Sequence, residues 1–197
     1  MRVLKFIFIF LVLGLNSRAE FILKSYAEIK NEKLVRQNYE QSCGAASLAT
    51  LINLISDKKL SELDILQTMS TEEIYTDMLS FADLSVLAQK LGFESKSYQI
   101  DKENLNKLIG IPLLVKIEDD PRFPHFVIII NHKGDFLQVL DPSHGEYISS
   151  KNQFLNLWDK HSRGGFALIL AFEKDLETLK PKLPKSLNFD IKPFSLY

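Results

Sequence analysis

The sequence predicts an α+β fold in which a helical N-terminal lobe packs on an antiparallel β-sheet lobe. From residue 43 to Gly110, apolar side chains recur at helical spacing, in runs that polar joints separate. After Gly110 the chain changes to short runs rich in β-branched and aromatic residues, divided by turn residues such as Asp-Pro and Lys-Gly-Asp. Helices in one half of a chain and strands in the other are typical of the α+β class.

The N-terminus has the pattern of a secretory signal peptide over residues 1–19. Two basic residues precede an apolar core over 6–15 and a small-x-small cleavage site at 17–19. An uncleaved anchor is the alternative, but the apolar core is short against the roughly twenty residues that a membrane span needs. We therefore expect cleavage after Ala19 and an exported mature protein, periplasmic or extracellular.

The composition fits one soluble globular domain, with 46% hydrophobic residues and a formal net charge of −1. Without a basic surplus, nothing indicates a nucleic-acid partner. The single cysteine, Cys43, cannot form an intramolecular disulfide. In an exported protein it is therefore a buried bystander, an intermolecular link or a reactive thiol.

The elements follow in order. Residues 20–34, with lysine and glutamate interleaved, are expected to form a lead-in segment or an edge strand. Helices are expected over 43–55, 61–69, 81–91 and 101–109, started by Ser61, Ser80 and Asp101 and closed by Gly92 and Gly110, with a loop over 71–76. Strands are expected over 111–117, 126–131, 136–140, 146–148 and 165–172, with a helix over 151–158 before the last strand. Residues 173–197 are expected to form an extended C-terminal extension.

Cys43 is the candidate nucleophile. A polar loop precedes it and a helical pattern follows it, so its thiol lies at a helix N-terminus, where free N–H groups and the helix dipole stabilise a thiolate. Six residues upstream, Gln37 offers an amide that, with the Cys43 backbone N–H, can bind the oxyanion of an acyl-transfer intermediate. Gln41 is the alternative donor. A lone cysteine that packs as a small hydrophobe is the alternative for Cys43.

His125 and Asp141 are the candidate base and its orienting carboxylate. His125 stands at the start of an apolar strand and can take the Cys43 proton, then return it to the leaving amine. Asp141 ends the next strand, sixteen residues later, and can accept a hydrogen bond from the other imidazole nitrogen. A structural histidine and an ordinary Asp-Pro turn are the alternatives.

The remaining histidines, His132, His144 and His161, occupy polar or turn-like settings and are expected on the surface. Four histidines and one cysteine lack the paired spacing of a zinc site, so no metal and no cofactor is expected.

These motifs together resemble the double-glycine-leader peptidases, family 39 of the papain-like cysteine peptidases. The resemblance rests on Gln37, five intervening residues, then Cys43-Gly44-Ala45-Ala46 and Leu48-Ala49-Thr50-Leu51, with PHFVIII around His125 and VLDP around Asp141. It covers roughly residues 35–172 and implies a papain-like fold for that range. Ser42 stands where transporter-fused members usually have an acidic residue, and the sequence shows no transporter or ATP-binding domain.

The resemblance implies a bacterial cysteine peptidase in which Cys43, His125, Asp141 and Gln37 are the catalytic residues, and the signal-peptide pattern adds that it is exported. It implies a peptide or protein substrate, cut after the Gly-Gly motif of a leader peptide, as in bacteriocin processing, and a secretion or surface-assembly system as partner. Two alternatives stay open: a non-enzymatic module that binds a peptide or partner of such a system, and acyl transfer to an amine by the same residues. Contact with a membrane is expected only through the signal peptide, if it is not cleaved.

Overall fold

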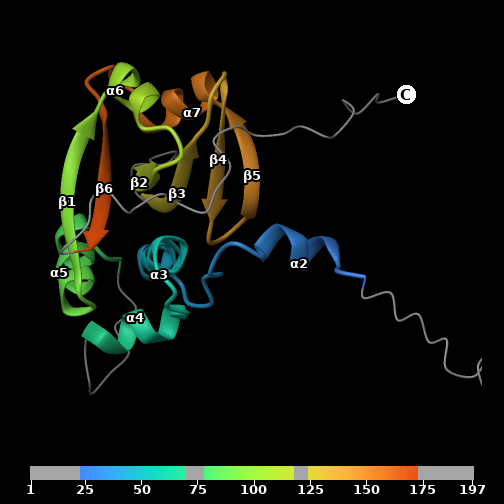
Figure 1. The fold of residues 1–197 in the computed structure, drawn as a ribbon, viewed down its shortest axis with the longest axis vertical. Coiled ribbons are helices and arrows are strands. Elements are labelled where there is room, and N and C mark those ends of the chain that lie inside the picture. The colour runs from blue at the N-terminus through green and yellow to red at the C-terminus, as the bar shows by residue number, and fades with distance from the viewer. Residues whose placement is uncertain (1–22, 70–77, 118–123, 173–197) are drawn as a thin grey trace, which may run out of the picture.

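The computed structural model describes residues 23–69, 78–117 and 124–172 (Figure 1). The predicted signal peptide, the loop over 71–76 and the C-terminal extension over 173–197 lie outside these residues. Among the helices that are described, none is long and apolar enough to cross a membrane.

The helices agree closely with the sequence pattern. They are α2 (Tyr26–Asn31), α3 (Cys43–Ile55), α4 (Glu62–Met69), α5 (Phe81–Lys90), α6 (Lys102–Lys107) and α7 (Lys151–Trp158). The predicted N-caps are confirmed: the side chains of Ser61, Ser80 and Asp101 each accept a hydrogen bond from the backbone N–H three residues later. Helix α2 lies in the lead-in segment, so the edge strand considered there is wrong.

The sheet has six antiparallel strands in the order β1-β6-β2-β3-β4-β5. The strands are β1 (Phe93–Ile100), β2 (Pro112–Ile117), β3 (His125–Asn131), β4 (Phe136–Asp141), β5 (Gly145–Ser150) and β6 (Gly165–Phe172). Five of them are the predicted strands, and the predicted helix over 151–158 is present as α7.

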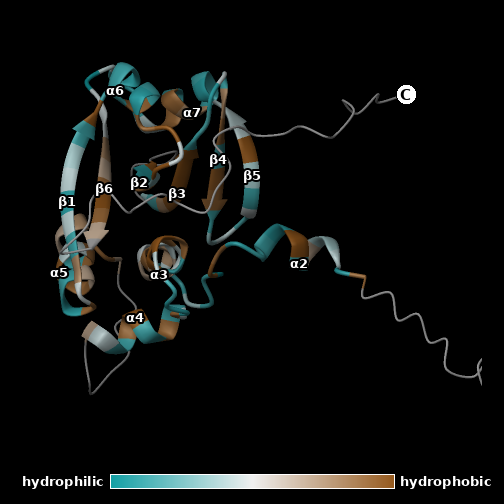
Figure 2. Ribbon diagram, viewed as in Figure 1, coloured by the Kyte–Doolittle hydropathy of each residue, from teal (hydrophilic) through white to brown (hydrophobic). Residues whose placement is uncertain are grey.

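Strand β1 was not predicted, because the region before Gly110 was assigned wholly to helices, and that assignment is wrong for residues 93–100. This strand pairs with β6 alone and buries only its two ends, Phe93 and Ile100. An edge strand with polar side chains between its ends has no apolar alternation to reveal it. Figure 2 shows the contrast, since β1 is mostly teal and white whereas β3 is brown.

Apolar layers cover both faces of the sheet. Along β3, Phe126, Ile128 and Ile130 pack with side chains of α3, α4 and α5. The alternate residues Val127 and Ile129 pack with Leu105 of α6 and with side chains of α7. Every residue from Phe126 to Ile130 is buried, as expected for a strand covered on both faces. This packing places the start of α3 beside the start of β3.

Candidate functional site

Cys43 is the first residue of α3, and its side chain is buried, with 4% of the residue exposed. The first hydrogen bond of the helix joins Ala46 N–H to the Ser42 carbonyl over 3.0 Å. The backbone N–H groups of residues 43–45 therefore have no partner within the helix. They and the helix dipole favour negative charge at this end of α3.

Two contacts fix the position of α3 on β3. Ser47 Oγ donates a hydrogen bond to the Phe126 carbonyl over 3.0 Å. At Gly44, a Cβ atom would lie 3.3 Å from both the Phe126 ring and Leu79 Cβ, so only glycine lets the helix start approach this closely without displacing its neighbours. Gly44 follows Cys43 and Phe126 follows His125, so these contacts fix the position of the Cys43 thiol relative to the His125 ring.

His125 and Asp141 form a directly bonded pair. His125 Nε2 lies 2.9 Å from Asp141 Oδ1, across the adjacent strands β3 and β4. Burial acts to lower the pKa of His125, but hydrogen bonds and charge interactions with Asp141 and the Cys43 side chain outweigh it and raise the pKa from 6.5 to about 9. Because Nε2 is hydrogen-bonded to Asp141, the other ring nitrogen, Nδ1, is the one that can interact with the Cys43 side chain.

The carboxylate of Asp141 is held by the turn that follows it. Its Oδ1 also accepts the backbone N–H groups of Ser143 and His144, at 2.7 and 3.0 Å. Burial acts to raise the pKa of Asp141, yet the bond from His125 and these two N–H groups lower it to about 2. The carboxylate is thus ionised and fixed in place at neutral pH.

Gln37 is held by the same turn. Its backbone N–H donates to the Pro142 carbonyl over 3.1 Å, and its side-chain Oε1 accepts the Ser143 hydroxyl over 2.8 Å. With its carbonyl oxygen engaged, the amide Nε2 remains as the donor that Gln37 can direct elsewhere. The rival residue Gln41 is exposed and has a left-handed backbone with φ of 65°.

Residues 37, 43, 125 and 141 are therefore joined through a short chain of contacts. Two of the residues that hold these side chains, Ser143 and Glu62, could not be recognised from the sequence. Ser143 lies in what reads as an ordinary Asp-Pro turn, although it contacts both Gln37 and Asp141. Glu62 reads as an exposed acid at a helix start, whereas only 2% of it is exposed.

The other histidines differ in their settings. His132 is fully buried, with Nε2 3.2 Å from Gln138 Oε1, so its predicted surface position is wrong. Strand β3 pairs with β4 as far as Asn131, and His132 follows directly in the chain. This position buries His132 inside the domain. His161 is exposed as predicted. His144 is also exposed, and its Nδ1 lies 3.1 Å from Asp141 Oδ2.

The donor atoms of His125, Asp141 and His144 lie within 4.8 Å of one another, so these three described side chains are the ones that could meet a metal ion. Asp141 Oδ1 already accepts three N–H groups, and 74% of the His144 side chain is exposed. Hydrogen bonds to the Asp141 carboxylate therefore explain why these three side chains lie close together.

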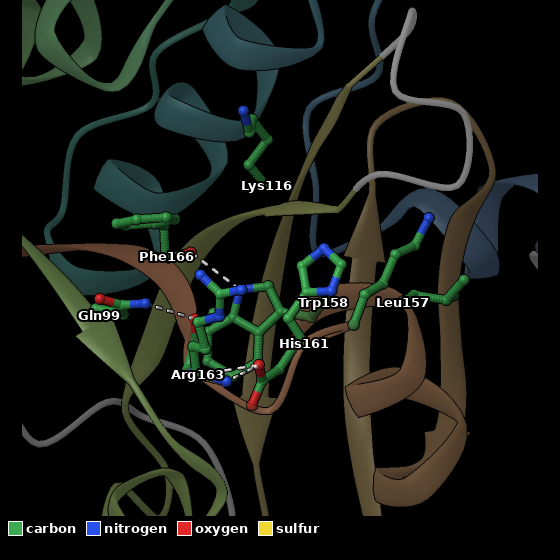
Figure 3. A pocket seen from close by; sticks show the side chains of 11 residues that line it. Gln99, Lys116, Leu157, Trp158, His161, Arg163 and Phe166 are labelled. Atoms are coloured by element: carbon green, nitrogen blue, oxygen red, sulfur yellow. Dashed lines mark hydrogen bonds between the residues drawn. The ribbon is translucent and has the colours of Figure 1, made fainter.

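A cavity of about 350 Å³ lies apart from these residues, between the end of α7 and the start of β6 (Figure 3). Trp158 Nε1 donates to the Phe166 carbonyl over 2.9 Å, and Gln99 Nε2 donates to the Gly164 carbonyl over 3.2 Å. Arg163 and Lys116 also line it, but none of the four candidate catalytic residues does.

A family model described as the peptidase C39 family matches residues 31–163. The chain is 28% identical over 141 residues to a probable functional amyloid protease, FapD, of Pseudomonas aeruginosa. This alignment covers 70% of this chain and 62% of that protein. Over 155 residues it is 23% identical to the lactococcin-G-processing and transport ATP-binding protein LagD of Lactococcus lactis, covering 78% of this chain and 20% of that protein. The chain thus spans about three fifths of the first relative and one fifth of the second.

Two solved structures share the fold. The peptidase domain of Streptococcus ComA, a bifunctional ABC transporter of a quorum-sensing pathway, aligns with a TM-score of 0.59 at 23% identity, over 72% of this chain and 98% of that domain. A double-glycine-motif protease from an AMS/PCAT transporter, in complex with its leader peptide, aligns with a TM-score of 0.56 at 23% identity, over 70% and 89%. These alignments confirm the predicted α+β fold.

Proposed function

Because the chain belongs to the peptidase C39 family, we propose that it is a cysteine peptidase whose nucleophile is Cys43. One observation supports this above all. Cys43 begins a helix beside His125, and His125 Nε2 lies 2.9 Å from a buried, ionised Asp141. A nucleophile, a base and a group that orients the base are the parts that covalent catalysis by cysteine requires.

The reaction begins with proton transfer from the Cys43 thiol to His125. A pKa of about 9 favours the protonated ring, so the proton taken from Cys43 stays on His125 at neutral pH and the two side chains rest as a thiolate–imidazolium pair. The thiolate attacks the substrate carbonyl carbon, an S–C bond forms, and the C=O electron pair moves to the oxygen. When this intermediate collapses, the C–N bond breaks and His125 gives its proton to the departing amine. Water then attacks the thioester carbon while His125 takes one of its protons. The C–S bond breaks to release the acid, and the proton returns from His125 to sulfur, which restores the thiol.

The negative oxygen of the intermediate requires donors that are fixed before the reaction starts. Gln37 supplies its amide Nε2, because Ser143 occupies the amide carbonyl. The Cys43 backbone N–H, which has no partner within α3, supplies the second donor. Gln37 is preferred to Gln41, which is exposed and is not held by the turn after Asp141.

For the substrate, we propose the leader segment of an exported peptide or protein, cut after a Gly-Gly motif. The resemblances to a bacteriocin-processing transporter and to a protease bound to a leader peptide support this class. Glycine at both positions before the cut lets the substrate backbone approach a narrow site that side chains would block. We further propose that residues 1–19 are a signal peptide and that the peptidase works outside the cytoplasm with a secretion or surface-assembly system.

The experiment uses the purified mature chain, residues 20–197, and peptides in which an amphipathic helix precedes Gly-Gly, Gly-Ala or Ala-Ala. Mass spectrometry identifies the products, and Cys43→Ala is the control. We expect cleavage after the second residue of Gly-Gly only, and none by the variant.

Three other results would each change the proposal. Equal cleavage of all three peptides would contradict the double-glycine specificity. A product joined to an added amine would indicate acyl transfer. Tight binding of the Gly-Gly peptide by wild type without any cleavage would indicate a binding module.

A further inference from the structure

Glu62, the first residue of α4, is a carboxylate buried inside the domain, with 2% of the residue exposed. Charged side chains are seldom buried to this extent unless they have partners. The carboxylate accepts the backbone N–H of Asn38 at 3.0 Å on both oxygens and the Asn38 side-chain amide at 3.0 Å on Oε2. It also accepts the Tyr39 backbone N–H at 3.5 Å and the Ser42 hydroxyl. All of these donors belong to residues 38–42.

Residues 38–42, which we call the linking segment, join Gln37 to Cys43. The segment is irregular, and at Gln41 it adopts a left-handed backbone with φ of 65° that a residue with a side chain seldom takes. Such a conformation is strained and persists where the surroundings determine it. Glu62 supplies these surroundings, since it contacts the segment on both sides of Gln41.

Glu62 is itself held firmly. Asn53 of α3 exchanges two hydrogen bonds of 2.8 Å with the backbone of Leu60, just before α4. On the exposed side of the same helix start, Ser61 and Asp64 bond to each other and not to the Glu62 carboxylate, including one bond of 2.7 Å from Ser61 N–H. The N-terminal end of α4 also carries partial positive charge, which favours the Glu62 carboxylate. The carboxylate thus connects the helix that bears the thiol to the segment that precedes it.

The ends of the linking segment are the two oxyanion donors of the proposed reaction. Gln37 is fixed to the turn after Asp141, and Cys43 is fixed on β3 through Gly44 and Ser47. These contacts anchor the two ends of the linking segment on the paired strands β3 and β4, but they do not hold the backbone between the ends. Glu62 holds that backbone, because its two oxygens bind residues on both sides of Gln41.

We propose that Glu62 is a positioning residue for the oxyanion site, which holds the linking segment so that the Gln37 amide and the Cys43 N–H converge on one substrate oxygen. This proposal rests on the proposed peptidase function. A displacement of either donor weakens stabilisation of the intermediate more than it weakens binding of the substrate.

The test compares Glu62→Gln with Asp64→Ala. Glutamine keeps the size of the side chain but turns an N–H₂ group toward the Asn38 donors. Asp64→Ala removes an exposed cap from the same helix without touching the linking segment, and so controls for loss of stability. The readouts are kcat and KM on the Gly-Gly peptide, the rate of Cys43 alkylation by iodoacetamide, and Tm.

We expect Glu62→Gln to lower kcat by roughly ten- to a hundredfold, less than the roughly hundred- to thousandfold for complete loss of an oxyanion donor, with KM changed less than about twofold. Alkylation should change less than about threefold, because that reaction forms no oxyanion. Asp64→Ala should lower Tm but leave kcat within about twofold. Equal loss of kcat in both variants, or a fall in alkylation that matches the fall in kcat, would overturn the proposal.

Hydrogen exchange separates this proposal from the peptidase proposal. Amides 38 and 39 should exchange at least roughly tenfold faster in Glu62→Gln and at the wild-type rate in Asp64→Ala. Absence of turnover by wild type with a reactive Cys43 would refute the peptidase function alone. Unchanged exchange at these amides in Glu62→Gln would refute the role of Glu62, whatever the activity.

Discussion

Replacing Asp141 with asparagine removes the negative charge beside His125 and leaves the surrounding hydrogen bonds in place. Asp141 Oδ1 accepts His125 and the backbone N–H groups of Ser143 and His144, and an asparagine carbonyl can accept the same three donors. The new N–H₂ group would replace Oδ2, which faces His144 Nδ1. Asp141→Asn therefore tests charge with little change of shape.

The magnitude follows from the pKa of His125. Its rise from 6.5 to about 9 corresponds to roughly 3 kcal/mol in favour of the protonated ring. This contribution to the free energy of unfolding is fully present below pH 6.5 and is lost as the pH rises from 6.5 to about 9. For Asp141, whose pKa is lowered from 3.8 to about 2, the contribution is present above pH 3.8 and is lost as the pH falls toward 2.

Urea unfolding of the wild type and of Asp141→Asn between pH 5.5 and 9 measures this effect. We expect the variant to be less stable by a few kcal/mol at pH 5.5 to 6.5. The gap should shrink by up to roughly 3 kcal/mol as the pH rises to 9, because the Cys43 side chain contributes part of the His125 shift. The same comparison, made with and without Asp141→Asn in a Cys43→Ala background, removes the contribution of the thiol to the His125 pKa. A gap that stays constant from pH 6.5 to 9 would show that Asp141 does not hold the proton on His125.

Three further predictions concern other parts of the chain. Gln37→Ala should lower kcat by roughly a hundredfold, about 3 kcal/mol, with little effect on Cys43 alkylation, whereas Gln41→Ala should do little; the reverse result would make Gln41 the donor. Gly44→Ala should lower the free energy of unfolding by roughly 1–3 kcal/mol in urea unfolding, since the added methyl group meets buried side chains, and an unchanged stability would disprove the close contact with β3. Intact mass of the exported protein should match a chain that begins at Glu20, and a full-length species in the membrane would contradict cleavage.

Local signals were enough to predict most of the fold. Helix N-caps such as Ser80 and Asp101 act on the backbone within three residues, so the sequence displays both partners of each bond. The central strands show continuous apolar runs because both of their faces are covered. Strand β1 was not predicted because it lies at one edge of the sheet, where it pairs with β6, a strand distant in the sequence. Most of its side chains are not buried, so its sequence carries no apolar pattern.

The candidate site divides in the same way. Cys43 and His125 each begin a periodic run and Asp141 ends one, so a change of pattern marks all three positions. Glu62 and Ser143 act across 24 and 106 residues, on Asn38 and Gln37 respectively, and no local pattern records such a contact. Burial of His132 likewise depends on the pairing of β3 with β4.

The burial of α3 affects how the thiol can be used as a probe. Every residue from Cys43 to Ile52 is buried, so the nucleophile sits on a helix at the centre of the domain instead of on a surface loop. Central helices open only when most of the domain opens with them. A small alkylating reagent reports the chemistry of the native thiol, whereas a reagent too bulky for the site can react only after cooperative unfolding. With the bulky reagent, the labelling rate of this single cysteine becomes a measure of the opening free energy of the domain.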